Sequence, residues 1–471
     1  MSANIKIGND TLQGVDAVEL ENADALGSYV KFTLGVAGGY TVTFVANGSN
    51  FEVCSVVAGK SVARPNTPTS EGQFFNGWYT DATGGTEVTF PYTPTQDTTL
   101  YARFSDLIIV GVTGLTNENG ILTFTDAIAG IETYTISQEG DYVSVTNPLS
   151  NYFPFNQISE FTDAEGNVFV KYPQLWMKWE LDTNGNINGY KFSNGNAGEG
   201  YFIPDAFLDP KDTVNDTYLP YFALGKYEMS GSSAKGFSKS GQTCLENLTI
   251  ESARTAARAY GNTENLYKGY QQLDLAQLTL YNLMCMMFYG TSNIQKVCGG
   301  RTGNGTVTSW NGASVTGTCD GVTGMNGWNV ATDCVKMLGI ENPYGNITKW
   351  CDGVVFSGGF TNSTIYVQRY PQNYGSNGNA MGFNRPSSDG YIKFFKNGTS
   401  DKTRSYMYAS EIGGSASTYC GDYTTGIGSC LCVGGTWGND SNAGLWCLAG
   451  DVDTSTPGDG ARLSYRPVQV V

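Results

Sequence analysis

The chain has 471 residues, of which 40% are hydrophobic and 13% aromatic, a content that supports real cores and excludes wholesale disorder. Only 15% of the residues are charged, with 27 Lys and Arg against 43 Asp and Glu and a formal net charge of -16. This acidity argues against nucleic acid and anionic membranes as partners, because both require a basic footprint. The length predicts about two to four domains.

The counts of individual residue types indicate the fold class and exclude several kinds of catalytic and metal site. Abundant Gly, Tyr and Phe with few charges predict a β-rich, turn-rich protein with a polar, uncharged surface. The sequence has no histidine, which excludes His-based catalytic triads and the commonest zinc ligand sets. The first residues, MSANIKIGNDTLQG, have no apolar h-region and no basic start. We therefore expect the eleven cysteines to be mostly reduced thiols in a protein made in a bacterial cytoplasm.

Residues 1–36 alternate apolar and polar positions, for example at Ile5, Ile7 and Leu12. This pattern predicts short strands or an extended arm. An arm without a core of its own needs a partner surface or sister chains. We predict an arm for attachment or oligomerisation.

Residues 37–105 contain short period-2 runs separated by Gly and Pro turns, which predict strands. The strings TVTF, GKSV, GWYTDATGGTEV and TTLYARF, in that order, resemble the Listeria-Bacteroides repeat, also called the internalin B-repeat. The resemblance implies a small β-grasp-like module used as a spacer in surface proteins. The following residues 106–150 are predicted to be another small β module or a linker.

Two helices are predicted in the rest of the chain, at residues 250–261 and 273–290. The second is apolar over a wide arc, with Leu275, Leu278 and Met286 on one face and Leu280 and Leu283 adjoining, so we expect it to be buried against a sheet. The predicted fold class is mainly β with two helices (α+β).

Five strings within residues 151–471 carry a second resemblance: PYFALGKYEMSG, QLTLYNLMCMMFYGTSNIQKV, GIENPYGNITKWCDGVVF, GGTWGNDSNAGLWCLAG and GARLSYRP. They resemble the C-type lectin-like fold of formylglycine-generating enzymes and of the variable proteins of diversity-generating retroelements. Similar domains are common at the tips of bacteriophage fibres. The resemblance implies one receptor-binding domain with its ligand face in residues 434–467. The sequence departs from the pattern after Leu448, where DVDTSTPGDG replaces an Asn/Ser-rich run.

The same resemblance implies which side chains face the ligand. The predicted ligand-binding residues are Thr436, Asn439, Asp440, Ser441, Asn442, Trp446 and Asp451, with Gly438, Leu445, Cys447 and Ala449 displayed beside them. Asn and Asp hydrogen-bond to sugar hydroxyls or peptide groups, and a Trp offers a stacking face. We rank Asn439, Asp440 and Asn442 above either Trp ring, and expect Trp437, Gly444 and Arg462 to be scaffold.

An enzyme of the formylglycine-generating type is the main rival, because that family uses cysteine thiolates. Only VGGTW, residues 433–437, keeps part of the family's RVxRGG motif, and Cys430, Cys432 and Cys447 lack its cysteine spacing. Cys430 and Cys432 would share a strand face, but that spacing is too weak to indicate a metal site. No enzyme activity, cofactor or metal is predicted. A calcium ion has no supporting motif either, since the DTNGNING segment beginning at Asp182 lacks the required Gly and Glu and is predicted to be a hairpin.

The sequence therefore predicts a bacteriophage head- or tail-fibre protein at the virion surface that binds a glycan or protein on the bacterial host. The arm would contact other virion proteins, and a trimer would add avidity. No nucleic-acid partner and no membrane insertion are predicted, since no apolar run is long enough to cross a bilayer. A bacterial surface adhesin with the same domains and a structural capsid or tail decoration protein remain as alternatives.

Overall fold

The computed structural model forms two compact units, Met1–Leu107 and Ile108–Val471. The residues that the structure describes are 3–7, 10–15, 17–23, 27–33, 39–125, 133–214, 216–260, 269–306, 311–357, 363–398, 406–426 and 428–467. Within them the protein is mainly β with two α-helices, which confirms the predicted fold class. No helix among them is long and apolar enough to cross a membrane.

The smaller unit begins with two antiparallel hairpins within the predicted arm, β1 (Ala3–Ile7) with β2 (Asp10–Val15) and β3 (Ala17–Ala23) with β4 (Gly27–Thr33). A four-stranded sheet follows in the order β6-β5-β8-β7. Its strands are β5 (Gly39–Ala46), β6 (Ser49–Val57), β7 (Gln73–Tyr79) and β8 (Thr98–Asp106).

This sheet has its own core around Trp78. The indole of Trp78 is 1% exposed and meets the ring of Phe44 edge-on, with ring centroids 4.8 Å apart. Val42 and Leu100 complete the centre, and both are fully buried. The alternation of Val42 and Phe44 along β5 matches the period-2 pattern from which these strands were predicted.

The larger unit begins with strands that were predicted to form a separate module or a linker. β9 (Ile109–Thr113) pairs with β16 (Ile187–Ser193), and β12 (Tyr142–Thr146) pairs with β21 (Gly327–Asn329). The described part of residues 106–150 is therefore built into the larger unit from Ile108 onward, because its strands use ladder partners far along the chain. β15 (Trp176–Leu181) and β16 form the predicted hairpin.

The other sheets of the larger unit are short and mostly antiparallel. Three are ordered β10-β9-β16-β15, β11-β12-β21-β22-β23 and β13-β14-β17-β34-β20, and two smaller ones are β18-β19 and β25-β26-β27. The strands not yet given bounds are β10 (Thr123–Phe124), β11 (Thr135–Glu139), β13 (Ser159–Thr162), β14 (Val168–Pro173), β17 (Tyr221–Gly225), β18 (Ser230–Ser232), β19 (Lys235–Phe237), β20 (Tyr270–Gln272), β22 (Cys334–Met337), β23 (Ile340–Glu341), β25 (Val354–Ser357), β26 (Thr364–Val367), β27 (Asn379–Asn384) and β34 (Leu463–Tyr465).

A seven-stranded sheet carries the C-terminal part of the chain, in the order β29-β28-β30-β32-β31-β24-β33. Its strands are β24 (Thr348–Cys351), β28 (Gly390–Asn397), β29 (Met407–Ile412), β30 (Tyr423–Gly426), β31 (Cys430–Val433), β32 (Leu448–Asp451) and β33 (Asp459–Gly460). β30 runs parallel to β32, and β24 runs parallel to β33, while the remaining pairs are antiparallel.

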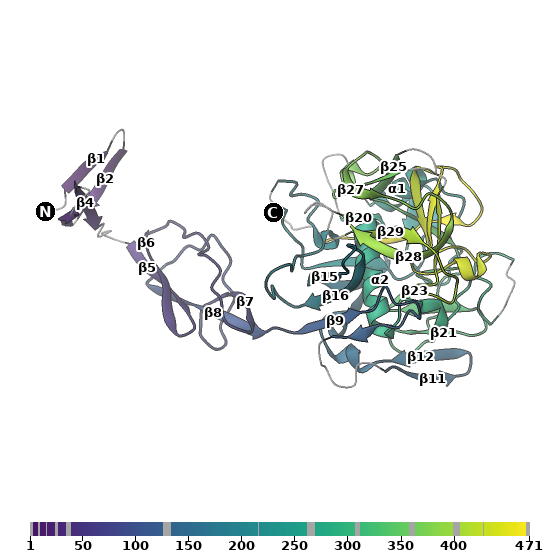
Figure 1. The fold of residues 1–471 in the computed structure, drawn as a ribbon. Coiled ribbons are helices and arrows are strands. Elements are labelled where there is room, and N and C mark those ends of the chain that lie inside the picture. The colour runs from purple at the N-terminus through teal and green to yellow at the C-terminus, as the bar shows by residue number, and fades with distance from the viewer. Residues whose placement is uncertain are drawn as a thin grey trace. The chain divides into compact units, whose positions relative to one another are not determined.

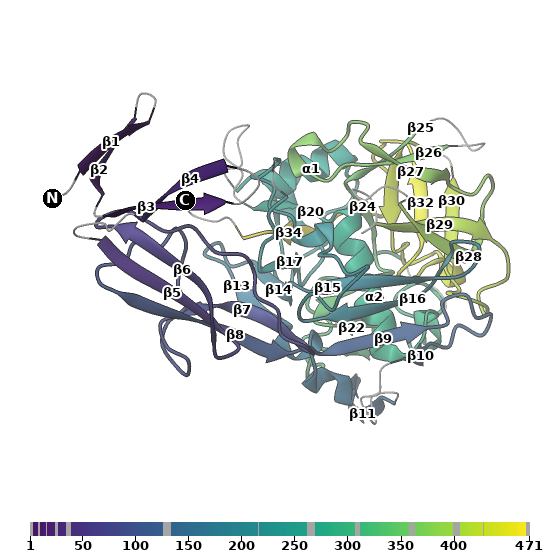
Figure 2. The ribbon, with the colours of Figure 1, turned by 60° about the vertical axis from the view of Figure 1, so that its left-hand side comes forward.

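Both predicted helices are present, as α1 (Ile250–Arg258) and α2 (Leu275–Tyr289). α2 begins where the Asp274 side chain accepts a hydrogen bond from the backbone N–H of Gln277 and ends at Gly290, whose φ of 64° suits glycine. All fifteen residues of α2 are buried. Figures 1 and 2 show it in the interior of the larger unit, among strands, which explains why its sequence is apolar on nearly every side.

Polar groups of α2 tie the helix to the C-terminal part of the chain. The amide nitrogen of Asn282 donates to the carbonyl oxygen of Leu445 at 2.7 Å, and the indole N–H of Trp446 donates to the sulfur of Met286 at 3.4 Å. These two bonds fix the backbone of residues 445–446 against the centre of the core. The segment predicted to carry the ligand face is thus anchored to α2, a helix whose residues are all buried.

Candidate functional site

The residues predicted to bind a ligand fall into two environments within one short segment. A polar loop, residues 436–442, leaves the end of β31 and includes the 3-10 helix Asp440–Asn442. Asn439 and Asp440 are exposed, and Thr436, Ser441 and Asn442 are half-buried. After the loop, the chain enters a buried run, residues 443–448, that leads into β32.

The polar loop is held in place by side-chain hydrogen bonds. The Asn439 side-chain oxygen accepts from both the backbone N–H and the hydroxyl of Thr436, at 2.6 and 2.8 Å. The hydroxyl of Tyr391, on β28, lies 2.9 Å from the Ser441 hydroxyl and donates to the Asn442 side-chain oxygen at 3.0 Å. The loop therefore presents its remaining polar atoms from a fixed backbone, which lowers the entropy lost on binding.

Asp440 has a backbone φ of 47°, in the left-handed region. Asp and Asn tolerate this conformation better than other residues with a side chain. The backbone N–H of Asp440 donates to the carbonyl oxygen of Thr302 at 2.7 Å, while its side chain is exposed. Asp440 thus supplies a solvent-facing negative charge at a fixed point of the loop.

Trp446 does not fit its predicted role as a ligand-binding residue. Its side chain is fully buried and packs on Phe395, with ring centroids 5.1 Å apart. The indole N–H is already bonded to Met286, so neither the ring face nor its donor is presented to solvent. Trp446 is a core anchor, because a large apolar ring in this segment gains more from burial than from display.

Two of the three residues predicted as scaffold, Gly444 and Arg462, are buried in the larger unit. A Cβ on Gly444, whose φ is 144°, would lie 1.8 Å from a carboxylate oxygen of Asp422, so only glycine fits there. Arg462 is 2% exposed and donates to four backbone carbonyl oxygens, those of Gly225, Lys226, Glu341 and Asn342. Trp437 is half-buried, and its backbone N–H donates to the carbonyl oxygen of Asn346.

Behind the polar loop lies a cavity of about 140 Å³, here called the C-terminal pocket. Its lining residues come from strands β24, β30, β31, β32 and β33, from the polar loop, and from one residue on each side of the loop, Gly435 and Cys447. They are Thr348, Tyr423, Thr425, Cys432, Gly435, Asn439, Asn442, Cys447, Ala449, Asp451 and Asp459. Thr425 and Cys432 both lie opposite Ala449 in the sheet, so these three residues line the pocket from one face. Among the predicted ligand-binding residues, Asn439, Asn442 and Asp451 meet at this pocket.

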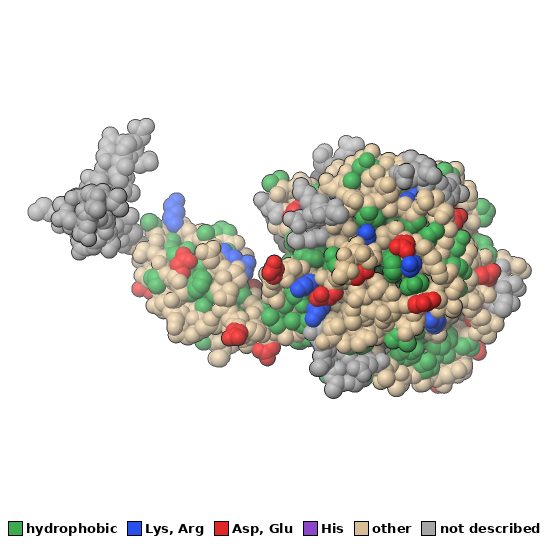
Figure 3. Space-filling view, viewed as in Figure 1, with side chains coloured by type: hydrophobic (Ala, Val, Ile, Leu, Met, Phe, Trp, Pro, Cys, Tyr) green, Lys and Arg blue, Asp and Glu red, His purple; other side chains and the backbone are tan. Residues whose placement is uncertain are grey.

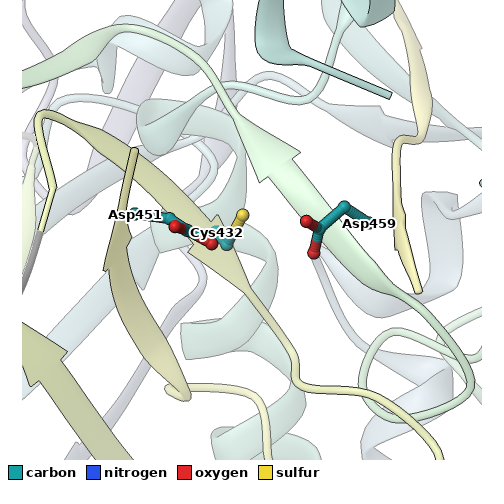
Figure 4. A group of neighbouring side chains, drawn as sticks. All are labelled: Cys432, Asp451 and Asp459. Atoms are coloured by element: carbon teal, nitrogen blue, oxygen red, sulfur yellow. The ribbon is translucent and has the colours of Figure 1, made fainter. Parts of the chain in front are cut away.

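Cys432, Asp451 and Asp459 form a cluster in the pocket, with one potential ligand atom from each lying within 4.8 Å of the others. Figure 4 shows the two aspartates on either side of Cys432, with their carboxylate oxygens turned toward it. Burial raises the pKa of Asp451, and a hydrogen bond from the Val452 N–H opposes this shift. Burial also raises the pKa of Asp459, against a hydrogen bond from Thr456, and the charge of Asp451 raises it further.

The cysteines near this face are poorly suited to act as nucleophiles. Burial raises the pKa of Cys447 to about 12, with a further increase from the Asp422 charge. Burial likewise raises the pKa of Cys430 and of Cys432. All eleven cysteines are free thiols in the structure, and most are buried. Since a thiolate is the reactive form, burial keeps the thiols at this face in their less reactive state.

Sequence reasoning missed part of the pocket. Three of the lining residues lie on strands that precede the predicted ligand-binding segment: Thr348, Tyr423 and Thr425. A fourth, Asp459, lies in the stretch after Leu448 that departs from the family pattern. Cys432 was considered, but only for its spacing from Cys430. The one signal in the sequence was the clustering of acidic residues after Leu448, and nothing in it places Asp459 beside Cys432, because β33 reaches the sheet through β24.

Comparison with known proteins identifies one module. Residues 40–103 match the Listeria-Bacteroides repeat domain. Internalin H of Listeria monocytogenes serovar 1/2a is 41% identical over 68 residues, which are 14% of this chain and 12% of Internalin H. The chain therefore spans a small part of that relative. This confirms the repeat resemblance noted in the sequence.

A comparison of structures relates the chain to a solved protein titled Major Tropism Determinant U1 Variant. The match has 12% sequence identity and a TM-score of 0.24, and it covers 74% of this chain and 78% of the other. A similarity this low carries no argument about the function of this chain, which has to be inferred from its own residues.

Proposed function

We propose that the chain is a bacteriophage virion surface protein that binds a receptor on the bacterial host through the polar loop and the C-terminal pocket, on a C-type lectin-like domain. The observation that carries this proposal is the arrangement of the loop. Exposed Asn439 and Asp440 and half-buried Asn442 stand beside a pocket, on a backbone fixed from β28 and α2. Such short polar side chains on a rigid support are typical of a recognition surface.

The fold part of the proposal is supported by how the family-like segments meet. β17, from the string beginning at Pro220, pairs with the closing strand β34, with Leu224 opposite Ser464. β24, from the string beginning at Gly339, pairs in parallel with β33, with Lys349 opposite Gly460, the first residue of the closing string. A hydrogen bond from Asn282 of α2 to Leu445 joins two further strings directly.

The chemistry of the face fits a ligand rich in hydroxyl or amide groups. With the Asn439 oxygen bonded within the loop, its amide NH₂ remains as a donor at the pocket. Asp440 offers an exposed carboxylate that accepts hydrogen bonds. The face of the larger unit that is visible in Figure 3 is mainly uncharged, with scattered Lys, Arg, Asp and Glu, which suits a glycan or protein receptor better than nucleic acid.

The rest of the chain fits a display role. The Listeria-Bacteroides repeat at residues 40–103 has its own core and would act as a spacer. The hairpins within residues 1–36 would contact other virion proteins, and a homotrimer would add avidity to weak single sites. In this proposal the protein is made in the bacterial cytoplasm, needs no cofactor for receptor binding and has no catalytic role; the raised pKa of Cys447 supports that last point.

A bacterial surface adhesin is the second candidate, favoured by the repeat match and by the 41% identity to part of Internalin H. A structural decoration protein of a capsid or tail would have no cell-binding face. Particle association separates these ideas: a fibre protein is found on purified phage and binds cells, an adhesin is found on the cells that make it, and a decoration protein binds particles but not cells.

The binding proposal is tested with the full chain on a panel of bacterial strains, by measuring cell-bound fluorescent protein. A combined Asn439→Ala, Asp440→Gly and Asn442→Ala variant should lose at least about ten-fold in affinity, equivalent to about 1.4 kcal/mol. Glycine at position 440 preserves the backbone conformation there. Asn196→Ala with Glu199→Ala, on another exposed loop, is the matched control. Unchanged binding by the combined variant, folded as judged by circular dichroism, would reject the site.

A further inference from the structure

The C-terminal pocket contains a set of donors that receptor binding does not explain. Cys432, Asp451 and Asp459 come from three different strands, β31, β32 and β33, yet their potential ligand atoms lie within 4.8 Å of one another. The sheet fixes two of them as neighbours, because Cys432 lies opposite Ala449 and Asp451 is two residues further along β32. Asp459 completes the group from the far side of β24.

The environment of Cys432 gives a second, independent observation. Its side chain is 1% exposed, lines the pocket, and has no hydrogen-bond partner within the described part of the chain. A free thiol packs well as a small apolar group, and Cys432 also belongs to an apolar core cluster, so its burial by itself requires no ligand. Because the sulfur has no partner among the described residues, it remains available to bind one. Figure 4 shows Cys432 between Asp451 and Asp459, and one potential ligand atom of each of the three side chains lies within 4.8 Å of the others.

The two carboxylates are also uncompensated. Asp451 accepts a hydrogen bond from the Val452 N–H at 2.7 Å, and Asp459 accepts one from the Thr456 hydroxyl. Neither forms a salt bridge with a Lys or Arg among the described residues. Two acidic groups in a partly desolvated pocket repel each other, and a bound cation would remove that repulsion.

We propose that Cys432, Asp451 and Asp459 form a binding site for one divalent transition-metal cation of the zinc class. Calcium and magnesium prefer oxygen ligands alone, whereas zinc binds Cys sulfur together with Asp oxygen. Three protein ligands leave a fourth position open toward the pocket, for water or a ligand oxygen. On binding, the cation replaces the thiol proton, which passes to solvent, and no electron is transferred.

The site would stabilise the C-terminal sheet by linking β31, β32 and β33. A metal that binds only the folded state raises the free energy of unfolding. Once the free metal concentration exceeds the dissociation constant, this increase grows with the logarithm of that concentration. This inference does not rest on receptor binding. If the chain binds zinc but no cells, the metal-site proposal stands and the receptor-binding proposal fails. If it binds cells but no zinc, the metal-site proposal fails and the receptor-binding proposal stands.

The test uses the full chain after treatment with a chelator, titrated with Co²⁺ as a spectroscopic substitute for Zn²⁺. We expect one Co²⁺ per chain, with an intense thiolate-to-cobalt charge-transfer band and the visible spectrum of a four-coordinate ion. Zn²⁺ should displace the Co²⁺ and raise the melting temperature, and Ca²⁺ at the same concentration should not. A wild-type chain without the charge-transfer band, or one stabilised equally by Ca²⁺, would overturn the proposal.

Three variants assign the ligands. Cys432→Ser should abolish the charge-transfer band, and Asp459→Asn, which is isosteric, should weaken Co²⁺ binding by about ten-fold or more. Cys430→Ser is the matched control, because it removes a thiol two residues away on the same strand but outside the cluster. Loss of the band in Cys430→Ser as complete as in Cys432→Ser would reject this ligand set. Should Cys432→Ser fail to fold, the Asp459→Asn and wild-type titrations still decide the question.

Discussion

The polar loop, residues 436–442, and the buried run, residues 443–448, are adjacent in sequence, yet they lie in opposite environments. In the loop, side chains bond to one another and to Tyr391 and leave Asp440 facing solvent. In the buried run, Trp446 is fully buried and Gly444 leaves room for Asp422. In the proposed function the short polar side chains of the loop contact the receptor, while the buried Trp446 ring holds the segment that carries them in place.

The largest effect is expected from Trp446→Ala. Removing a fully buried indole that packs on Phe395 should lower the free energy of unfolding by about 3–5 kcal/mol. Trp437→Ala removes a half-buried ring and should lower the free energy of unfolding by clearly less. Chemical denaturation of the full chain measures both. Equal losses for the two tryptophans would contradict the distinction between the buried run and the loop.

A smaller loss is expected from Gly444→Ala. The added methyl would lie 1.8 Å from a carboxylate oxygen of Asp422, at a φ of 144° that disfavours any side chain, so we expect a cost of about 2–3 kcal/mol. Gly438→Ala is the control, since a Cβ there would meet nothing within 4 Å. Thermal unfolding compares the two. A neutral Gly444→Ala would mean that Asp422 is not where the structure places it.

Asp422 makes the buried run sensitive to pH. Burial raises the pKa of its carboxyl from 3.8 to about 8, although the Trp446 N–H donates to it. The unfolded chain therefore releases this proton at a lower pH than the folded chain, and from about pH 4 to 8 this group lowers stability as pH rises, by at most about 1.4 kcal/mol per pH unit. Asp422→Asn should flatten that slope in denaturation curves recorded across this range. A slope unaltered by the substitution would argue against a buried, protonated Asp422.

A modest effect is expected from Asn439→Ala in the polar loop. The substitution removes the oxygen that accepts hydrogen bonds from the N–H and the hydroxyl of Thr436. It should lower the free energy of unfolding by only about 1 kcal/mol, because both groups can then hydrogen-bond to water. Hydrogen exchange at the Thr436 amide should accelerate while amides of β32 stay protected. Exchange that accelerates across β32 as well would show that the loop and the buried run unfold together.

The smallest effect on stability is expected from Asp440→Asn. Asparagine adopts a φ of 47° as readily as aspartate, and the Asp440 side chain is exposed, so the change should stay within about 0.5 kcal/mol. Glu199→Gln, at another exposed carboxylate, provides the comparison. A loss of stability well beyond this range would place Asp440 in the scaffold with Gly444.

The sequence was sufficient for the elements whose signals are local. α2 could be predicted from its wide apolar arc and the Gly at its end, and the repeat module from its strings and turns. Trp446 was misassigned because the resemblance that placed it on the ligand face does not give the direction in which its ring points. The place of residues 106–150 was left open because β9 and β12 pair with strands far along the chain.

The pocket could not be predicted for the same reason. Asn439, Asn442 and Asp451 were expected to meet a common ligand, and they do lie around one cavity. Cys432 and Asp459 lie at the same cavity only because the strands are ordered β32-β31-β24-β33. That order depends on β24 pairing with β31 in the antiparallel direction and with β33 in the parallel direction. Such non-local pairing has no signature in a single sequence.

Whether the polar loop binds the receptor while the buried run supports it can be decided by comparing cell binding of Asp440→Asn and Glu199→Gln in the full chain. Both substitutions remove one exposed negative charge and should leave stability unchanged. We expect Asp440→Asn to weaken binding to a susceptible strain several-fold, and Glu199→Gln to bind as the wild type does. Equal binding by the two variants would contradict a receptor site at the polar loop.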